Sequence, residues 1–170
     1  KKVKEVLKER KFDKKNAISS LPKPSLHWDF SQGLEDSILG LKCRLKAGAK
    51  VENGALHVTG GGYALTQKIP YGISEKTLSA WVQLDNLKQR SGGVMTIQTP
   101  NGAFFDSVVY AEKLQNIWMS GSNGFSRTEN FPLAPQEQKA DQQFVNIIIT
   151  YSKKGKISGY RNGEPYGKSY

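Results

Sequence analysis

Apolar and β-branched residues gather in short stretches along most of the chain, and Gly, Asn and Pro separate these stretches. The segment from Phe144 to Tyr151 contains neither Gly nor Pro, so we expect a buried strand there. Lys153–Gly155 predicts a turn, and Ile157–Arg161 predicts the returning strand. Asn162-Gly163 is the pair that a tight two-residue hairpin prefers, because both central residues need positive φ. Together these elements predict a three-stranded meander.

The clearest alternation lies between Thr77 and Leu84, where apolar residues share one face and Trp81 lies on the other. Large aromatic residues on sandwich strands are more often packed than exposed, so we expect Trp81 to be packed, and Trp28 to lie in the core. Further strands are expected over Leu26–Phe30, Ala55–Thr59, Tyr63–Gln67, Val94–Thr99, Phe104–Ala111 and Asn116–Ser120. Short strands at this spacing predict an all-β fold, an antiparallel two-sheet jelly-roll sandwich.

Charge separates a leader from the rest of the chain. The net charge is +10, and residues 1–24 hold nine Lys/Arg and three Asp/Glu, which leaves +4 for residues 25–170. The leader favours a short helix or tail as far as Lys15 and then a Pro-containing linker, so we expect one domain over 25–170. The mixed charges of that domain give no case for a nucleic-acid surface, and no apolar run is long enough to predict a membrane span.

Several stretches together resemble successive strands of a laminin G-like, concanavalin A-like jelly roll: LHWDFSQGLEDS, VENGALHVTGGGYALT, TLSAWVQL and FVNIIITYSKKGKISGYRNGEPYG. The stretch GGVMTIQTPNGAFFDSVVYAEKLQNIWMSGSNGFSRT is similar to the form of this domain in large planctomycete-type multidomain proteins with cytochrome c-like segments. The resemblance implies an extracytoplasmic location (periplasmic, cell-surface or secreted) and flanking domains of a parent protein. It also implies strands beyond Tyr166, so we expect the last strands to be missing from a sequence that stops at Tyr170.

The jelly roll that the resemblance implies also hosts glycoside hydrolases, which need two carboxyl groups roughly 5–9.5 Å apart. Asp106 and Glu112 share a face of one expected strand, but six residues place them roughly 20 Å apart if that strand is straight. His27 and His57 have no nucleophile or metal-ligand spacing near them. We therefore predict that the protein is not an enzyme and has no catalytic residues, with a hydrolase-like enzyme as the third alternative.

A lectin-like recognition module for a glycan or protein ligand is predicted instead, and a structural spacer without a ligand is the main alternative. The neighbours of Trp118 are apolar and expected in the core, so Trp118 is expected to face outward. Asp106 and Tyr110 share a face of the preceding strand, and Asn123 and Arg127 follow in the next loop. We expect these five residues to form one accessible polar-aromatic patch. In the alternative arrangement, Trp118 and Tyr110 pack beneath a loop and Asp106 pairs with Arg127 structurally.

A bound Ca²⁺ at the rim of the sandwich is a further implication of the laminin G-like resemblance. Calcium takes about 6–8 oxygen ligands, and carboxylates in loops supply several of them. The candidate ligands are Asp36 and Asp106, although neither lies in a densely acidic loop. No other cofactor is predicted. The single Cys43 cannot form an internal disulfide, so we expect it to be a small, buried apolar residue.

Overall fold

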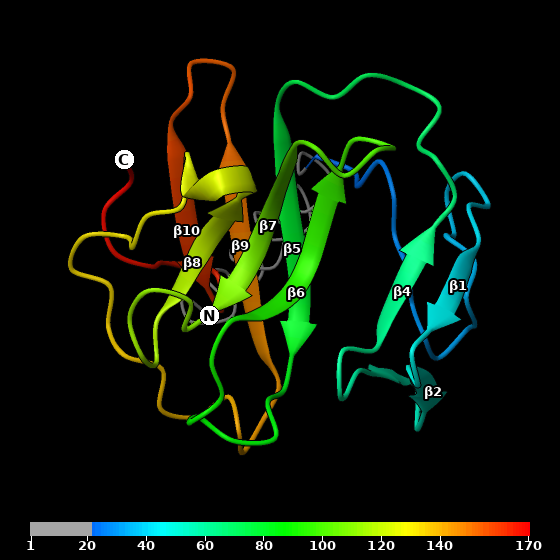
Figure 1. Ribbon diagram of the computed structural model, residues 1–170, viewed down its shortest axis with the longest axis horizontal. Helices are drawn as coiled ribbons and strands as arrows, with labels where there is room; N and C mark the ends of the chain where they lie inside the picture. Colours follow the sequence, from blue (N-terminus) through cyan, green and yellow to red (C-terminus); the bar gives the residue numbers. More distant parts are fainter. Residues whose placement is uncertain (1–21) are drawn as a thin grey trace, which may run out of the picture. The chain divides into compact units, whose positions relative to one another are not determined.

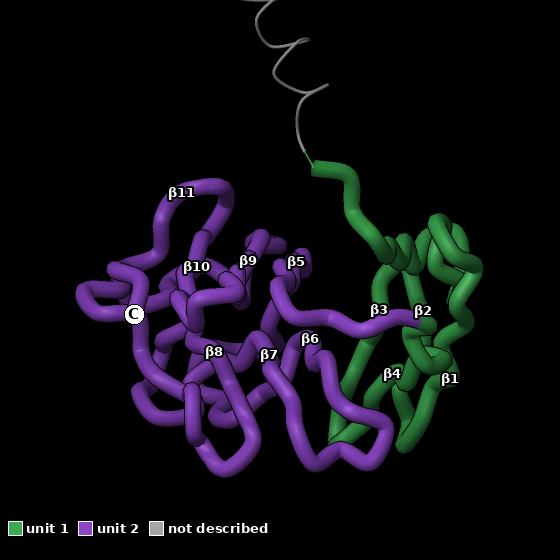
Figure 2. Tube along the Cα trace, turned by 90° about the horizontal axis from the view of Figure 1, so that it is seen from above, with its two compact units in different colours: residues 1–70 green, residues 71–170 purple. Residues whose placement is uncertain are grey.

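The computed structural model describes residues 22–170, and the predicted leader helix lies outside them. The described residues contain eleven strands and one short 3₁₀ turn, which confirms the predicted all-β class. They belong to two compact units, one ending at Pro70 (unit 1) and the other running from Tyr71 to Tyr170 (unit 2), coloured separately in Figure 2. The chain after residue 24, expected as one domain, is thus divided between these two units.

Unit 1 is built on an interrupted two-stranded ribbon. Strands β2 (Lys50–Glu52) and β3 (Ala55–His57) form a hairpin closed by Asn53-Gly54, whose φ angles of 51° and 75° suit a type I′ turn. Strand β1 (Cys43–Lys46), which precedes β2, pairs with β4 (Tyr63–Thr66), which follows β3, so the two pairs of strands succeed each other along one ribbon. The ribbon therefore uses two strands, β1 and β2, that the apolar pattern did not predict, because both are short and rich in charged residues.

Two predictions within unit 1 are wrong and one is confirmed. The segment Leu26–Phe30 is not a strand, because the Asp29 carboxylate accepts hydrogen bonds from the backbone N–H and the hydroxyl of Ser31 and so favours a turn. Trp28 is half-buried rather than enclosed, and its Nε1–H donates to a backbone carbonyl at 3.2 Å. Cys43 is free and buried as predicted, and burial raises the pKa of its thiol.

Unit 2 is a sandwich of two antiparallel sheets, which confirms the predicted architecture (Figure 1). One sheet has the strand order β11-β10-β9-β5 and the other has the order β6-β7-β8. The bounds are β5 (Lys76–Val82), β6 (Gly92–Gln98), β7 (Phe105–Tyr110), β8 (Trp118–Ser122), β9 (Val145–Tyr151), β10 (Ile157–Arg161) and β11 (Glu164–Pro165). The 3₁₀ turn, Asn123–Phe125, follows β8 directly.

The predicted meander is present as β9, β10 and β11. The turn between β10 and β11 is closed by Asn162 and Gly163, whose φ angles are 51° and 85°. Gly159 in β10 is needed for another reason: a Cβ atom at this position would lie 2.7 Å from the ring of Phe131. The bare backbone at Gly159 therefore gives Phe131 room to pack directly on the sheet.

The core lies between the two sheets. The inward positions of β9, from Val145 to Tyr151, are all buried, and they share one cluster with Val108, Tyr110 and Trp118 of the opposite sheet. Strands β5, β9 and β10 alternate between more and less buried positions, so only one face of their sheet lies in this core. Strand β8 differs, because all of its positions are buried and Met119 belongs to a second apolar cluster.

Candidate functional site

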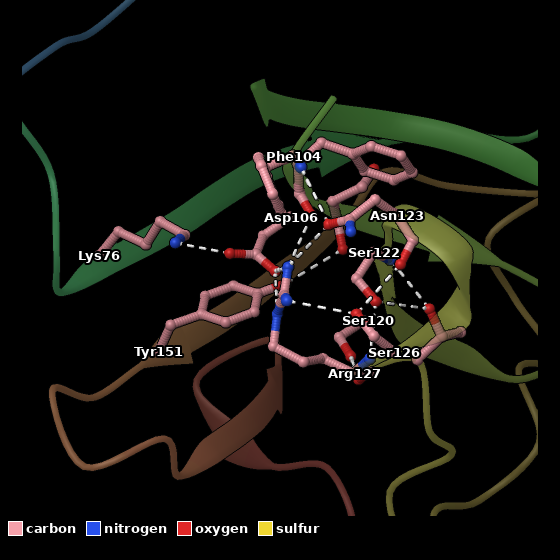
Figure 3. Close-up of polar contacts among 12 residues, drawn as sticks. Lys76, Phe104, Asp106, Ser120, Ser122, Asn123, Ser126, Arg127 and Tyr151 are labelled. Carbon is pink, nitrogen blue, oxygen red and sulfur yellow. Dashed lines mark hydrogen bonds and ion pairs between the residues drawn. The ribbon is translucent and has the colours of Figure 1, made fainter. Parts of the chain in front are cut away.

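Three charged side chains meet between the two sheets of unit 2 (Figure 3). Lys76 of β5 places its Nζ 2.6 Å from Oδ2 of Asp106 in β7, and Nε and Nη2 of Arg127 each lie 2.9 Å from Oδ1 of the same carboxylate. Because β5 and β7 belong to different sheets, the Lys76–Asp106 ion pair joins the two sheets of the sandwich. Both carboxylate oxygens of Asp106 are occupied by cationic partners.

The remaining donors of Arg127 fasten the loop after β8 to the start of β7. Its Nη2 also donates to the carbonyl oxygen of Phe105 at 3.0 Å and to Oδ1 of Asn123 at 3.2 Å, and Nη1 donates to Ser126 Oγ at 3.3 Å. The structure thus brings together Asp106, Asn123 and Arg127 from the predicted site. Since most guanidinium donors are already bonded within the protein, the role of Arg127 is structural: it holds the loop after β8 against the start of β7.

Trp118 and Tyr110 are not part of an accessible patch, and the prediction is wrong for both. Neither side chain has exposed surface, and their ring centroids lie 4.7 Å apart in the core. The Tyr110 hydroxyl donates to the carbonyl of Leu87 and to Oδ1 of Asn116, and burial raises its pKa to about 12. The physical reason is that both faces of β8 are covered. Because the face opposite the apolar neighbours of Trp118 is also buried, alternation alone does not predict that Trp118 is exposed.

A buried carboxylate, Glu137, holds the enclosed Trp118. Its Oε2 accepts from Nε1 of Trp118 and from Nε of Arg161, both at 2.7 Å, and its Oε1 accepts from Nη2 of Arg161 at 2.8 Å. Two backbone N–H groups complete the shell. Burial alone would raise the pKa of Glu137, but these donors outweigh it and lower the pKa to about 2. Glu137 is therefore ionised at neutral pH and cannot serve there as a proton donor.

The two proposed calcium ligands do not fit that role. The Asp36 carboxylate accepts backbone N–H groups of His27 and Leu39; burial alone would raise its pKa, but these hydrogen bonds bring it below the ordinary value. Asp106 faces Lys76 and Arg127, whose positive charges oppose a bound cation. Within residues 22–170, no three His, Cys, Asp or Glu side chains gather at one point. Neither candidate therefore lies in a cluster of carboxylates that could supply several ligands to calcium.

The outer face of the sheet containing β5 carries an exposed indole. Trp81 is 68% exposed, so alternation assigned its face correctly but the expectation that it would be packed is wrong. Directly across from Trp81 on β9 lies Asn146, and Nδ2 of Asn146 donates to Ser79 Oγ and to the Ala80 carbonyl, both at 3.3 Å. The indole therefore stands beside an amide whose orientation the neighbouring strand fixes.

A second aromatic side chain, Tyr160 of β10, lies on the same outer face, half-buried and in register with Ile148 of β9. Such a face offers ring surface for the apolar side of a ligand and hydroxyl or amide groups for its polar edge. These groups are carried on paired strands, so little conformational freedom remains to be lost when a ligand binds. The chemistry of this outer face suits a ligand that has both an apolar side and many hydroxyl groups, such as a sugar.

Comparison with protein-family models finds one match, which covers the part of the chain that forms both sheets of unit 2. The model described as "Concanavalin A-like lectin/glucanases superfamily" matches residues 58–169, which include every strand from β4 to β11. No curated protein and no solved structure matches the chain. In the part of the chain that the structure describes, no helix has the length and apolar character needed to cross a membrane.

Proposed function

The chain belongs to the concanavalin A-like lectin/glucanase superfamily, and from that premise we propose that it is a non-catalytic module that binds glycans through the outer face of β5, β9 and β10. The observation that carries the proposal is the exposed indole of Trp81 on a rigid sheet face. Tryptophan is usually well buried in a folded domain, so an indole that is 68% exposed on a sheet face is a candidate ligand contact.

Binding is favoured over hydrolysis by the state of the buried carboxylates. A glycosidase needs two carboxyl groups on either side of the scissile bond, one of them protonated. Asp106 is bonded to two cationic side chains, and Glu137 is fully bonded and ionised. Neither carboxylate has the freedom that proton transfer to a substrate requires, which supports recognition without cleavage.

A polysaccharide ligand also suggests where the module works. Polysaccharides other than storage polymers lie mostly outside the cytoplasm, so we propose that the protein works in the periplasm, at the cell surface or in the secreted fraction, as one part of a larger protein. Cell fractionation followed by immunoblotting tests this placement. Recovery of the protein solely from the cytoplasmic fraction would contradict it.

Affinity gel electrophoresis with soluble polysaccharides in the gel tests the binding function. We expect at least one polymer to retard the wild-type protein and Trp81→Ala to migrate as it does in a gel without polymer. The matched control is Phe104→Ala, which removes another exposed aromatic ring, 65% exposed, from the segment before β7. If Phe104→Ala abolishes retardation while Trp81→Ala keeps it, the binding site is not on the outer sheet face.

The same proteins distinguish the two alternatives. Release of reducing ends from a retained polymer would show that the module hydrolyses it, and would replace the proposed function with that of a glycosidase. Retardation of the wild type by no polymer would leave a structural spacer as the better interpretation. We expect retardation without any increase in reducing ends.

A further inference from the structure

We propose that the ligand of the outer face is an uncharged polysaccharide chain that contacts Trp81 and Tyr160 together. This inference rests on the proposed glycan-binding function and specifies its ligand class. Two features carry it: the complete lack of charge on the outward positions of three strands, and the spacing of the two aromatic residues on the sheet.

The outward positions of β5, β9 and β10 carry hydroxyl, amide, aromatic and aliphatic side chains. They are Thr77, Ser79, Trp81, Asn146, Ile148, Thr150, Ser158 and Tyr160. No charged residue stands among these positions of the described strands, although 24% of the chain is charged. The two charged residues within the same three strands, Lys76 and Arg161, lie on the inner side and bind Asp106 and Glu137.

A face without charge selects against an acidic glycan. A uronate or sulfate group brought against it would lose hydration without gaining a cationic partner, which is costly for an ionised group. A neutral sugar loses less, because its hydroxyl groups can bond to side chains such as Ser79 and Thr150 while its C–H face lies on the indole. The net charge of +10 is thus not a guide to the ligand, because the outward positions of the described strands β5, β9 and β10 carry none of it.

The positions of the two rings indicate how much ligand is bound. Trp81 pairs with Asn146, and Tyr160 pairs with Ile148, so the aromatic residues are two strands and two residues apart. Strand spacing and rise place their Cα atoms roughly 12 Å apart on a diagonal across the sheet. That separation exceeds one sugar ring, and the side chains between the rings are uncharged. A linear chain lying across β9 would contact both rings, whereas a monosaccharide would reach one.

Matched neutral and acidic polysaccharides test the ligand class. The probes are hydroxyethyl cellulose with carboxymethyl cellulose, dextran with dextran sulfate, and agarose with κ-carrageenan, each used in affinity gels. We expect at least one neutral polymer to retard the protein more strongly than its acidic counterpart, with retardation unchanged between low and high salt. Retardation only by acidic polymers, weakening steeply with salt, would overturn the neutral-ligand inference and leave the glycan-binding function intact.

Two substitutions test the second contact. We expect Tyr160→Ser to weaken binding of the retained polymer about tenfold and Tyr160→Phe to bind nearly as the wild type, because the ring is kept. Thermal unfolding of both variants checks that the sheet is intact. If Trp81→Ala loses binding while a folded Tyr160→Ser keeps it, the ligand does not span the two rings and this inference fails. If no polymer in the series is retained, the proposed function fails and the inference fails with it.

Discussion

Two tryptophans of unit 2, Trp118 in β8 and Trp81 in β5, lie on strands with different surroundings. Trp118 has no exposed surface; its ring packs against Tyr110 and its N–H is bonded to Glu137. Trp81 is 68% exposed, and among residues 22–170 no hydrogen bond of its indole N–H is found. Trp118 is thus held by packing and by a charge-assisted hydrogen bond at once, while Trp81 contributes little to the folded state.

The difference shows that the environment of a strand decides what a tryptophan does. Strand β8 is buried along its whole length, so a large residue anywhere on it stabilises the fold. Strand β5 has one face in the core and one outside it, so a large outward residue such as Trp81 can serve in binding without stabilising the fold. Substitutions on the two strands and at the buried carboxylates test this contrast.

Substituting the two tryptophans by alanine should separate stability from binding. We expect Trp118→Ala to lower the free energy of unfolding by about 3–5 kcal/mol, because it leaves a cavity and removes a donor from Glu137. Trp81→Ala should change it by less than about 0.5 kcal/mol, as surface substitutions usually do. Urea unfolding followed by circular dichroism measures both. If Trp118→Ala does not fold, Trp118→Phe keeps most of the ring volume and should still be less stable than the wild type.

Glu137→Gln should be the next most damaging change. It leaves Arg161 without its carboxylate partner, and breaking a largely buried ion pair by removing one member costs about 3 kcal/mol. Glu164→Gln, an exposed substitution in β11, is the matched control and should be nearly neutral. Equal unfolding midpoints for the two variants would contradict the structural role assigned to Glu137.

Acid should remove the stabilisation that Glu137 provides. The pKa of its carboxyl group falls from the ordinary 4.5 to about 2 in the folded protein, so the ionised form favours folding. The contribution is fully present above pH 4.5 and is lost as the pH falls from 4.5 toward 2. The stability difference between the wild type and Glu137→Gln, measured by urea unfolding, should therefore be large at pH 7 and shrink below pH 4. A difference that stays constant to pH 2.5 would exclude this linkage.

Asp106→Asn should have a smaller effect, about 1–2 kcal/mol, because Arg127 is partly exposed and can turn to water, and the amide oxygen of Asn can still accept a hydrogen bond. The neutral amide keeps the size of the side chain but leaves the two cations without a counter-charge. Glu129→Gln, which removes an exposed partner 3.9 Å from Lys113, is the control and should stay within about 0.5 kcal/mol. Thermal unfolding at low and high salt should show that only Asp106→Asn is clearly destabilised.

The alternation of residue types predicted those parts of the fold in which one strand face is buried. Leu78 and Trp81 were assigned to opposite faces of β5, and the Asn162-Gly163 turn was placed correctly. In β8 the same reasoning failed for Trp118, because a strand covered on both sides has no polar face to mark its outside. Ser120 is buried, and its hydroxyl donates a hydrogen bond to the carbonyl of Arg127. A pattern that only separates apolar from polar residues cannot predict such a buried polar side chain.

Long-range polar contacts were the other part that the sequence could not provide. Asp106, Asn123 and Arg127 were grouped because a short connection joins the strand of Asp106 to the next strand and the other two residues follow in the loop after it, and they do meet. Glu137 and Arg161 are 24 positions apart and on different elements, so no spacing rule links them. Their partnership depends on how the segment before β9 packs across the sheet, which is a property of the whole sandwich.

The pairing of β5 with β9 has a consequence for how the protein folds. Asn146 and Ser79, which contact each other across these strands, are 67 positions apart in the chain. During synthesis β5 emerges long before β9, so the edge of β5 that pairs with β9 stays without that partner while the intervening strands are made. Contacts over such separations slow folding, and an unpaired strand edge can meanwhile join another chain. The completion of this sheet therefore depends on the late β9–β10 hairpin, and chaperone demand during expression should be greatest before that hairpin has left the ribosome.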